Sequence, residues 1–137
     1  MIAREPIDPT RVRRIGDGSF AFIPHRFLQG GFLASLDPDQ RGLYLFLVLA
    51  ADRGGISFYA YDRICSVLEL SLDAYIAARN ALIGMDLVAF DGRRFQVLSL
   101  PDAPAPPAAP LRSRQNLEDR DPATIRHLLC DALHQDR

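Results

Sequence analysis

The stretch Ile56–Leu100, ISFYAYDRICSVLELSLDAYIAARNALIGMDLVAFDGRRFQVLSL, carries the clearest structural pattern in this 137-residue chain. We interpret it as a short strand, a helix, a tight turn, a second helix and two strands joined at Asp91-Gly92. Apolar side chains recur at helical spacing in the first of these helices. Their positions are Tyr61, Ile64, Val67 and Leu68.

The second helix and the hairpin have local signals of their own. Ser71 is a good N-cap because its hydroxyl can accept from a backbone N–H of the first turn, where Asp73 adds favourable negative charge. Asp91-Gly92 lies between alternating apolar runs and tolerates the positive φ that a tight hairpin turn requires. The stretch therefore predicts a mainly α domain with a small β-hairpin, in the order of a winged helix-turn-helix.

Composition bounds the class of protein. The length predicts one domain plus tails, and an apolar fraction of 48% is enough for a hydrophobic core. The net charge of −1 provides no overall attraction to nucleic acid or membrane. The longest apolar run, Leu43–Ala51, is shorter than the roughly 20 residues of a membrane span, and we recognise no signal peptide. We therefore expect a cytoplasmic protein with no membrane partner.

Arginine supplies all 16 basic residues, and this side chain suits phosphate and base contacts better than lysine does. Residues 1–18 form a predicted flexible basic arm, in which Arg11, Arg13 and Arg14 cluster. The cluster is either a solvated tail or an arm that contacts a phosphate backbone. Residues 19–23 alternate weakly and predict a short strand, and Pro24–Gln29 predicts a short helix.

A helix over Pro38–Asp52 is predicted from its first residues and its length. Asp37 is placed to cap it, Pro38 takes the position that needs no N–H, and Gln40 can reach back. This helix is apolar nearly all round. We therefore expect it to be central and covered on every side.

The last helix of the motif divides into a core stripe and an opposite face. The stripe comprises Tyr75, Ala78, Leu82 and Leu87. The opposite face, which a DNA reader would place in the major groove, comprises Asp73, Ala77, Asn80, Ala81 and Gly84. On or beside it, only Asn80 and Arg79 have base-reading chemistry, and a smooth Ala/Gly face also suits close approach of another backbone.

Arg93 and Arg94 directly follow the hairpin turn. They belong either to an ordinary solvated tip or to a wing that contacts phosphates or the minor groove. The complete set of candidate DNA-binding residues is Arg13, Arg14, Arg63, Ser71, Arg79, Asn80, Arg93 and Arg94.

The C-terminal part is predicted to be a Pro/Ala-rich linker over residues 101–120 and an amphipathic helix over 121–137. The helix's apolar stripe needs a partner, which is its own domain, a second copy of the chain or another protein. Cys130 and His134 lie four residues apart, but no second Cys/His pair completes a zinc site. With no phosphate loop or catalytic motif either, we expect a protein that is not an enzyme and has neither cofactor nor metal.

The segment Phe20–Leu28, FAFIPHRFL, is followed by the capped apolar helix, the helix-turn-helix and the hairpin. This order resembles the N-terminal winged-helix module of DnaD-type primosomal proteins and plasmid replication initiators. Those modules open with an extended (I/L)PK-like segment, whose place is taken here by Phe22-Ile23-Pro24-His25. The resemblance covers residues 19–100 and implies a DNA-binding or assembly role in replication or its control, often on mobile elements.

Two features depart from the family pattern. Asp86 stands where the family usually has Gly before the wing, and the exposed face of the last helix lacks Lys and Arg. Two hypotheses therefore follow. The first is a dimeric, DNA-binding winged-helix protein of replication initiation or transcription control that binds double-stranded DNA. The second is a winged helix that serves as a protein-interaction module.

Overall fold

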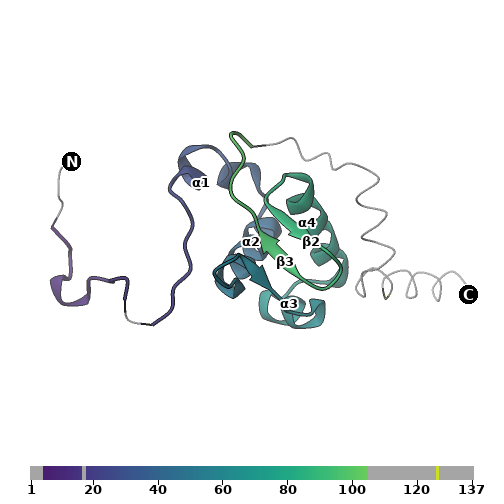
Figure 1. Ribbon diagram of the computed structural model, residues 1–137, viewed down its shortest axis with the longest axis horizontal. Helices are drawn as coiled ribbons and strands as arrows, with labels where there is room; N and C mark the ends of the chain where they lie inside the picture. Colours follow the sequence, from purple (N-terminus) through teal and green to yellow (C-terminus); the bar gives the residue numbers. More distant parts are fainter. Residues whose placement is uncertain (1–4, 17, 105–125, 127–137) are drawn as a thin grey trace, which may run out of the picture.

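A computed structural model describes residues 5–16, 18–104 and 126 of the chain (Figure 1). Its elements are η1 (Pro9–Arg11), α1 (Arg26–Gln29), η2 (Leu33–Ser35), α2 (Pro38–Ala50), β1 (Ile56–Ser57), α3 (Tyr61–Leu68), α4 (Leu72–Gly84), β2 (Val88–Phe90) and β3 (Phe95–Val97). The two η elements are single 3-10 turns. The prediction of a helix-rich domain with a small β-hairpin is confirmed at this level.

Helix α2 lies at the centre of the domain and packs against α3, α4, β1 and β3. The predicted capping box is present, since the Asp37 carboxylate accepts from the Gln40 N–H at 2.8 Å and the Gln40 side chain accepts from the Asp37 N–H at 3.1 Å. The buried side of the helix comprises Leu43, Tyr44, Leu47 and Val48. The prediction of cover on every side is wrong, because Leu45 is 50% and Leu49 is 66% exposed.

The connection between α3 and α4 is tight. Glu69 ends α3 in the left-handed conformation, with φ 55°, and the Leu70 N–H donates to the Cys65 carbonyl at 3.0 Å. The Ser71 hydroxyl then caps α4 by accepting from the Ala74 N–H at 3.1 Å, as predicted. The hydrogen bonds at the end of α3 and at the start of α4 therefore help to set the direction of one helix relative to the other.

The sheet has the order β1-β3-β2 and is antiparallel throughout. The predicted hairpin is present, and its Phe90 pairs with Phe95 at the loop end. Ser57 of the predicted strand β1 pairs with Phe95 from the other side. Asp86 precedes β2 with φ 63°, a conformation that Gly adopts without cost and Asp tolerates.

A glycine is required where β1 begins. Gly55 has φ +82°, and a Cβ at this position would lie 2.6 Å from the Val97 carbonyl oxygen. The same close approach lets the Val97 N–H donate to the Gly55 carbonyl at 2.8 Å. Gly55 therefore extends the contact between β1 and β3 by one hydrogen bond.

The strand predicted over residues 19–23 is wrong, since this segment is extended without sheet pairing. Strand β3 already has a neighbour on each side, and the outer edge of β1 is occupied by Asp52, which exchanges hydrogen bonds with Ile56. The segment is instead anchored by Arg26, whose guanidinium donates to the carbonyls of Leu100, at 3.0 Å, and Pro101, at 2.6 Å. The helix predicted over Pro24–Gln29 is present but begins at Arg26.

The core stripe predicted for the last helix is confirmed for Tyr75, Ala78 and Leu82, which are at most 2% exposed on α4. Leu87 is also buried, but its assignment to the helix is wrong, because α4 ends at Gly84. The linker predicted over 101–120 and the helix predicted over 121–137 lie outside the described residues, apart from 101–104 and Arg126. Within the described part of the chain, no helix has the length and apolar character to cross a membrane.

Candidate nucleic-acid interface

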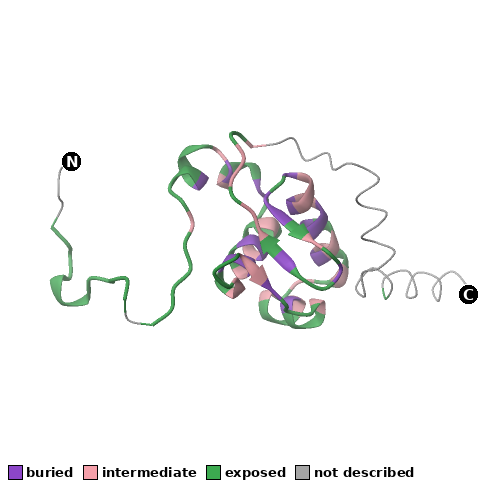
Figure 2. Ribbon diagram, in the orientation of Figure 1, coloured by how far each residue is buried: buried purple, intermediate pink, exposed green. Residues whose placement is uncertain are grey.

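Much of α4 is buried or partly buried (Figure 2), and the two base-reading candidates on this helix are among its buried residues. Arg79 is 0% exposed and Asn80 is 7% exposed. The Nε and Nη2 atoms of Arg79 donate to Oδ1 of Asn80 at 3.2 and 3.1 Å. The prediction that this pair lies on a DNA-facing surface is therefore wrong.

The Arg79 guanidinium lies between two aromatic rings. Its Cζ atom is 5.7 Å from the centroid of Tyr75, one turn earlier on α4, and 5.1 Å from the centroid of Phe90 on β2. Cations are attracted to the faces of such rings, and the long arginine stem packs well on apolar surface. Burial also raises the pKa of Tyr75 to about 12, although the neighbouring Arg79 charge acts in the opposite direction. Arg79 thus joins α4 to the hairpin.

The exposed face of α4 is small and poor in positive charge. Asp73 and Ala77 are exposed, while Ile76 and Ala81 are partly exposed. The Ser71 hydroxyl at the start of the helix is already occupied by its capping bond. This face has no exposed arginine among the described residues, so it lacks the side chains that commonly read guanine.

The hairpin loop presents the best-placed positive charge. Oδ1 of Asp91 accepts from the backbone N–H groups of Arg93, at 2.9 Å, and Arg94, at 2.7 Å. Oδ2 of Asp91 also accepts from the Arg94 Nε at 2.9 Å. Both arginines are exposed. The hydrogen bonds to Asp91 therefore fix the backbone from which these two side chains project.

We expect the Asp91 carboxyl group to titrate well below an ordinary aspartate. Hydrogen bonds from the backbone N–H groups of Arg94 and Arg93, then from the Arg94 side chain, lower its pKa from 3.8 to about 2. Because the folded pKa is the lower one, the contribution of Asp91 to hairpin stability is present above pH 3.8 and is lost as pH falls towards 2. A side-chain NMR titration measures the pKa of Asp91, and an ordinary aspartate pKa would contradict the loop geometry. Arg94→Ala should raise the pKa of Asp91 only in part.

The remaining candidates are exposed but lie on other parts of the chain. Arg63 is on the first turn of α3. Arg13 and Arg14 follow η1 in a segment that runs away from the helical domain (Figure 1). The structure thus holds Arg93 and Arg94 together on one loop and does not bring the arm to them.

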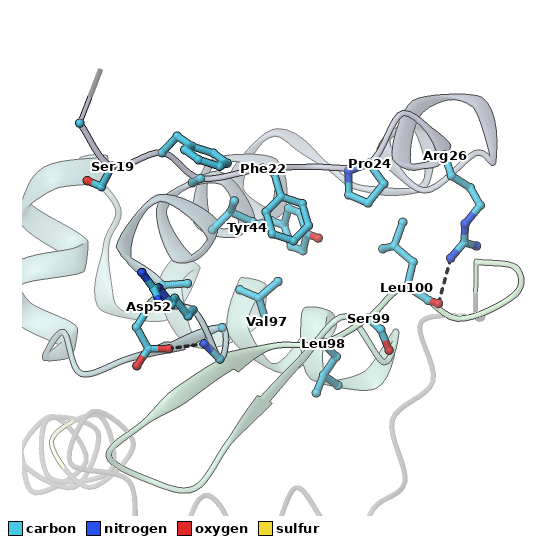
Figure 3. Close-up of a pocket in the computed structure, with 18 residues that line it drawn as sticks. Ser19, Phe22, Pro24, Arg26, Tyr44, Asp52, Val97, Leu98, Ser99 and Leu100 are labelled. Atoms are coloured by element: carbon cyan, nitrogen blue, oxygen red, sulfur yellow. Dashed lines mark hydrogen bonds between the residues drawn. The ribbon is translucent and has the colours of Figure 1, made fainter. Parts of the chain in front are cut away.

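A hollow of about 990 Å³ lies between the N-terminal segment and the domain (Figure 3). Its wall includes Phe20 and Phe22 on one side and Tyr44, Val97 and Leu100 on the other. Two of the three charged side chains that line it hold the backbone, since Arg26 donates to carbonyls after β3 and Asp52 accepts from the N–H groups of Gly54 and Ile56. Arg53 is the third. Within the described residues, no group of three His, Cys, Asp or Glu side chains could hold a metal ion.

Comparison of this chain with known proteins covered protein-family models, curated proteins and solved structures. None of the three comparisons finds a match. Any function assigned to the chain therefore rests on its own residues and their geometry.

Proposed function

We propose that residues 19–100 form a winged helix that binds duplex DNA and acts in replication initiation or transcription control. The element order α2, β1, α3, α4, β2, β3, with β3 between the other two strands, supports this proposal. In such a fold the second helix of the helix-turn-helix approaches the major groove and the hairpin contacts the flanking backbone or minor groove.

The observation that carries the proposal is the hairpin loop. Asp91 holds the loop by three hydrogen bonds, and Arg93 and Arg94 project from it into solvent. A preorganised pair of guanidinium groups binds phosphate with little loss of backbone entropy. The side chain of Arg94 also meets Asp91, so Arg93 carries the less compensated positive charge of the two.

The same geometry favours contacts to the DNA backbone over reading of bases. Arg79 and Asn80 are occupied inside the domain, and the exposed face of α4 carries Asp73. Residues 19–104 contain nine Asp or Glu side chains and seven Arg side chains. Affinity must therefore come from a few exposed arginines, namely Arg63, Arg93 and Arg94, with the arm at Arg11, Arg13 and Arg14.

Replacing Arg93 and Arg94 together by alanine is expected to weaken binding to all duplex sequences alike. Each phosphate contact contributes roughly 0.9 to the slope of log affinity against log salt concentration, so the slope should flatten by about two. Fluorescence anisotropy with random and genomic duplexes across a salt series measures both effects. Arg53→Ala, an exposed arginine before β1, is the matched control and should leave the slope unchanged.

Two results would overturn the DNA proposal. One is the absence of binding even at low salt concentration, and the other is a double variant that binds like the parent. Either would leave a second candidate, in which the winged helix contacts a protein instead. The small, nearly uncharged outer face of α4 favours that candidate, since Ala77 and Ala81 permit close approach of another backbone.

A further inference from the structure

The hollow between the N-terminal segment and the domain has two apolar walls that face each other. One wall is the segment 19–24, in which Phe20 and Phe22 are 63% and 76% exposed. The other wall includes Val97, at the end of β3, and Leu100 beyond it (Figure 3). The volume of about 990 Å³ is at the upper end of the range for small-molecule sites, about 300–1,000 Å³. Apolar side chains on both sides of such a space favour a third apolar group that contacts both walls.

The N-terminal wall is anchored to the domain where it enters α1. Arg26 donates to the carbonyls of Leu100 and Pro101, which lie on the opposite wall and just beyond it (Figure 3). Phe27, the next residue, is buried and stacks on Tyr44 of α2, with ring centroids 4.7 Å apart. These contacts join the two walls at one end of the hollow, so its shape is set by the packing of the domain.

Tyr44 brings an unpartnered hydroxyl group to the hollow. The residue is 3% exposed, and it lies between the two walls in Figure 3. Among the residues that the structure describes, none forms a hydrogen bond with this hydroxyl. Burial raises the pKa of Tyr44 above its ordinary value, so the hydroxyl keeps its proton at neutral pH and can donate it. Buried tyrosine hydroxyls usually have a partner, which an acceptor oxygen inside the hollow would supply.

The charged side chains that line the hollow favour an anion. Arg26 and Arg53 contribute two positive charges and Asp52 contributes one negative charge, which leaves a net charge of +1. Arg53 is exposed, and its guanidinium has no hydrogen bond or ion pair with any described residue. A guanidinium group binds a carboxylate through two parallel hydrogen bonds. The neighbouring Asp52 carboxylate repels a dianion, such as a phosphate ester, more strongly than it repels a carboxylate.

The two free polar groups lie at different places along the hollow. Tyr44 and Arg53 are separated by the last six residues of α2, about 9 Å of helix, and by the start of the loop that follows. A ligand that contacts both must therefore be elongated. We propose that the hollow binds an elongated apolar carboxylate, which pairs its carboxylate with Arg53, lays its chain between the two walls and accepts a hydrogen bond from Tyr44 at a second oxygen. This site is separate from the proposed DNA contacts, because Arg63, Arg93 and Arg94 do not line it.

Isothermal titration calorimetry of the full chain tests the proposal with three probes of equal chain length, below the concentrations at which they form micelles. The probes are ω-hydroxydecanoate, decanoate and decanol. We expect ω-hydroxydecanoate to bind most tightly, because it supplies both the carboxylate and the second oxygen. Decanoate should bind at least tenfold more tightly than decanol, which lacks the negative charge.

A fluorescent reporter locates the bound probe. The chain contains no tryptophan, so Phe22→Trp places a single indole in the N-terminal wall. Its emission should shift to shorter wavelength as a probe enters the hollow and displaces water from the ring. Binding detected by calorimetry with no change in this emission would place the ligand elsewhere on the chain and would overturn the proposal.

Two substitutions separate the roles of the polar groups. Arg53→Gln should weaken binding of decanoate at least tenfold and leave that of decanol unchanged, since only decanoate carries a charge. Tyr44→Phe retains the ring that stacks on Phe27, and it should make ω-hydroxydecanoate bind no more tightly than decanoate. The matched control is Arg93→Ala with Arg94→Ala, which should leave all three affinities unchanged.

A parent chain that binds none of the three probes would contradict the proposal. So would an Arg53→Gln variant that keeps the preference of the parent for decanoate over decanol. Because Arg53 is exposed, this variant should retain the helix content of the parent by circular dichroism, and the result then does not depend on whether Tyr44→Phe is stable.

Discussion

Replacing Arg79 by alanine is expected to lower the free energy of unfolding by about 3 kcal/mol or more. The side chain is fully buried and its guanidinium lies over the rings of Tyr75 and Phe90. Its removal leaves a cavity between α4 and the hairpin and leaves Oδ1 of Asn80 without two of its donors. Urea unfolding followed by circular dichroism measures the loss.

Two further variants identify the cause. Arg79→Met retains most of the apolar stem, so it should recover part of the lost stability if packing matters as well as charge. Arg63→Ala, at an exposed arginine on α3, should change stability by no more than about 0.5 kcal/mol. If Arg79→Ala left stability unchanged and altered only DNA binding, Arg79 would belong to the interface after all.

Leu82→Ala is the second substitution with a large expected effect. Leu82 is 0% exposed within the core formed by α2, α4 and the sheet. Replacing a buried leucine by alanine typically costs about 2–5 kcal/mol, through lost apolar burial and the cavity that remains. The midpoint of urea unfolding should therefore fall sharply.

Ala77→Ser provides the comparison for Leu82. Ala77 lies on the exposed side of the same helix, where a hydroxyl remains in contact with water. We expect a change of about 0.5 kcal/mol or less. Equal shifts in melting temperature for the two variants would mean that α4 is rotated about its axis relative to the structure.

The parts of the fold that were predictable from the sequence are those fixed by neighbouring residues. The Asp37–Gln40 capping box, the Ser71 cap and the turn at Asp91-Gly92 each depend on groups within four residues of one another. Side-chain oxygens accept hydrogen bonds from backbone N–H groups a few residues away, so both partners can be recognised from the sequence alone. The apolar stripe of α4 was predictable for a similar reason, since its period is that of a helix.

The errors concern contacts between distant residues. A polar residue is assigned to the surface by its type, yet Arg79 is buried against Phe90, which lies on a strand. Its spacing of four residues from Tyr75 was the available signal for a stacked arginine. The segment 19–23 was misassigned because no local pattern reveals that β3 is paired on both sides and that Asp52 occupies the outer edge of β1.

For the candidate interface, the sequence located the hairpin arginines but misplaced the candidates on α4. The hairpin arginines were found because a turn signal and two basic residues are adjacent in the sequence. The α4 candidates failed because helical periodicity alone placed Asn80 on the outer face, whereas the structure turns it inward beside Arg79. The exposure of Leu45 and Leu49 on α2 was missed because a helix that is apolar all round gives no indication of which side another element covers.

The most direct test of the DNA proposal is amide NMR mapping of the chain with a short random duplex at low salt concentration. We expect chemical-shift changes at the hairpin loop, Asp91–Arg94, and near Arg63, which fade as salt is added. The amides of Leu45 and Leu49 should stay unchanged. A spectrum without changes, or changes confined to α2 around Leu45 and Leu49, would contradict binding of duplex DNA through the hairpin.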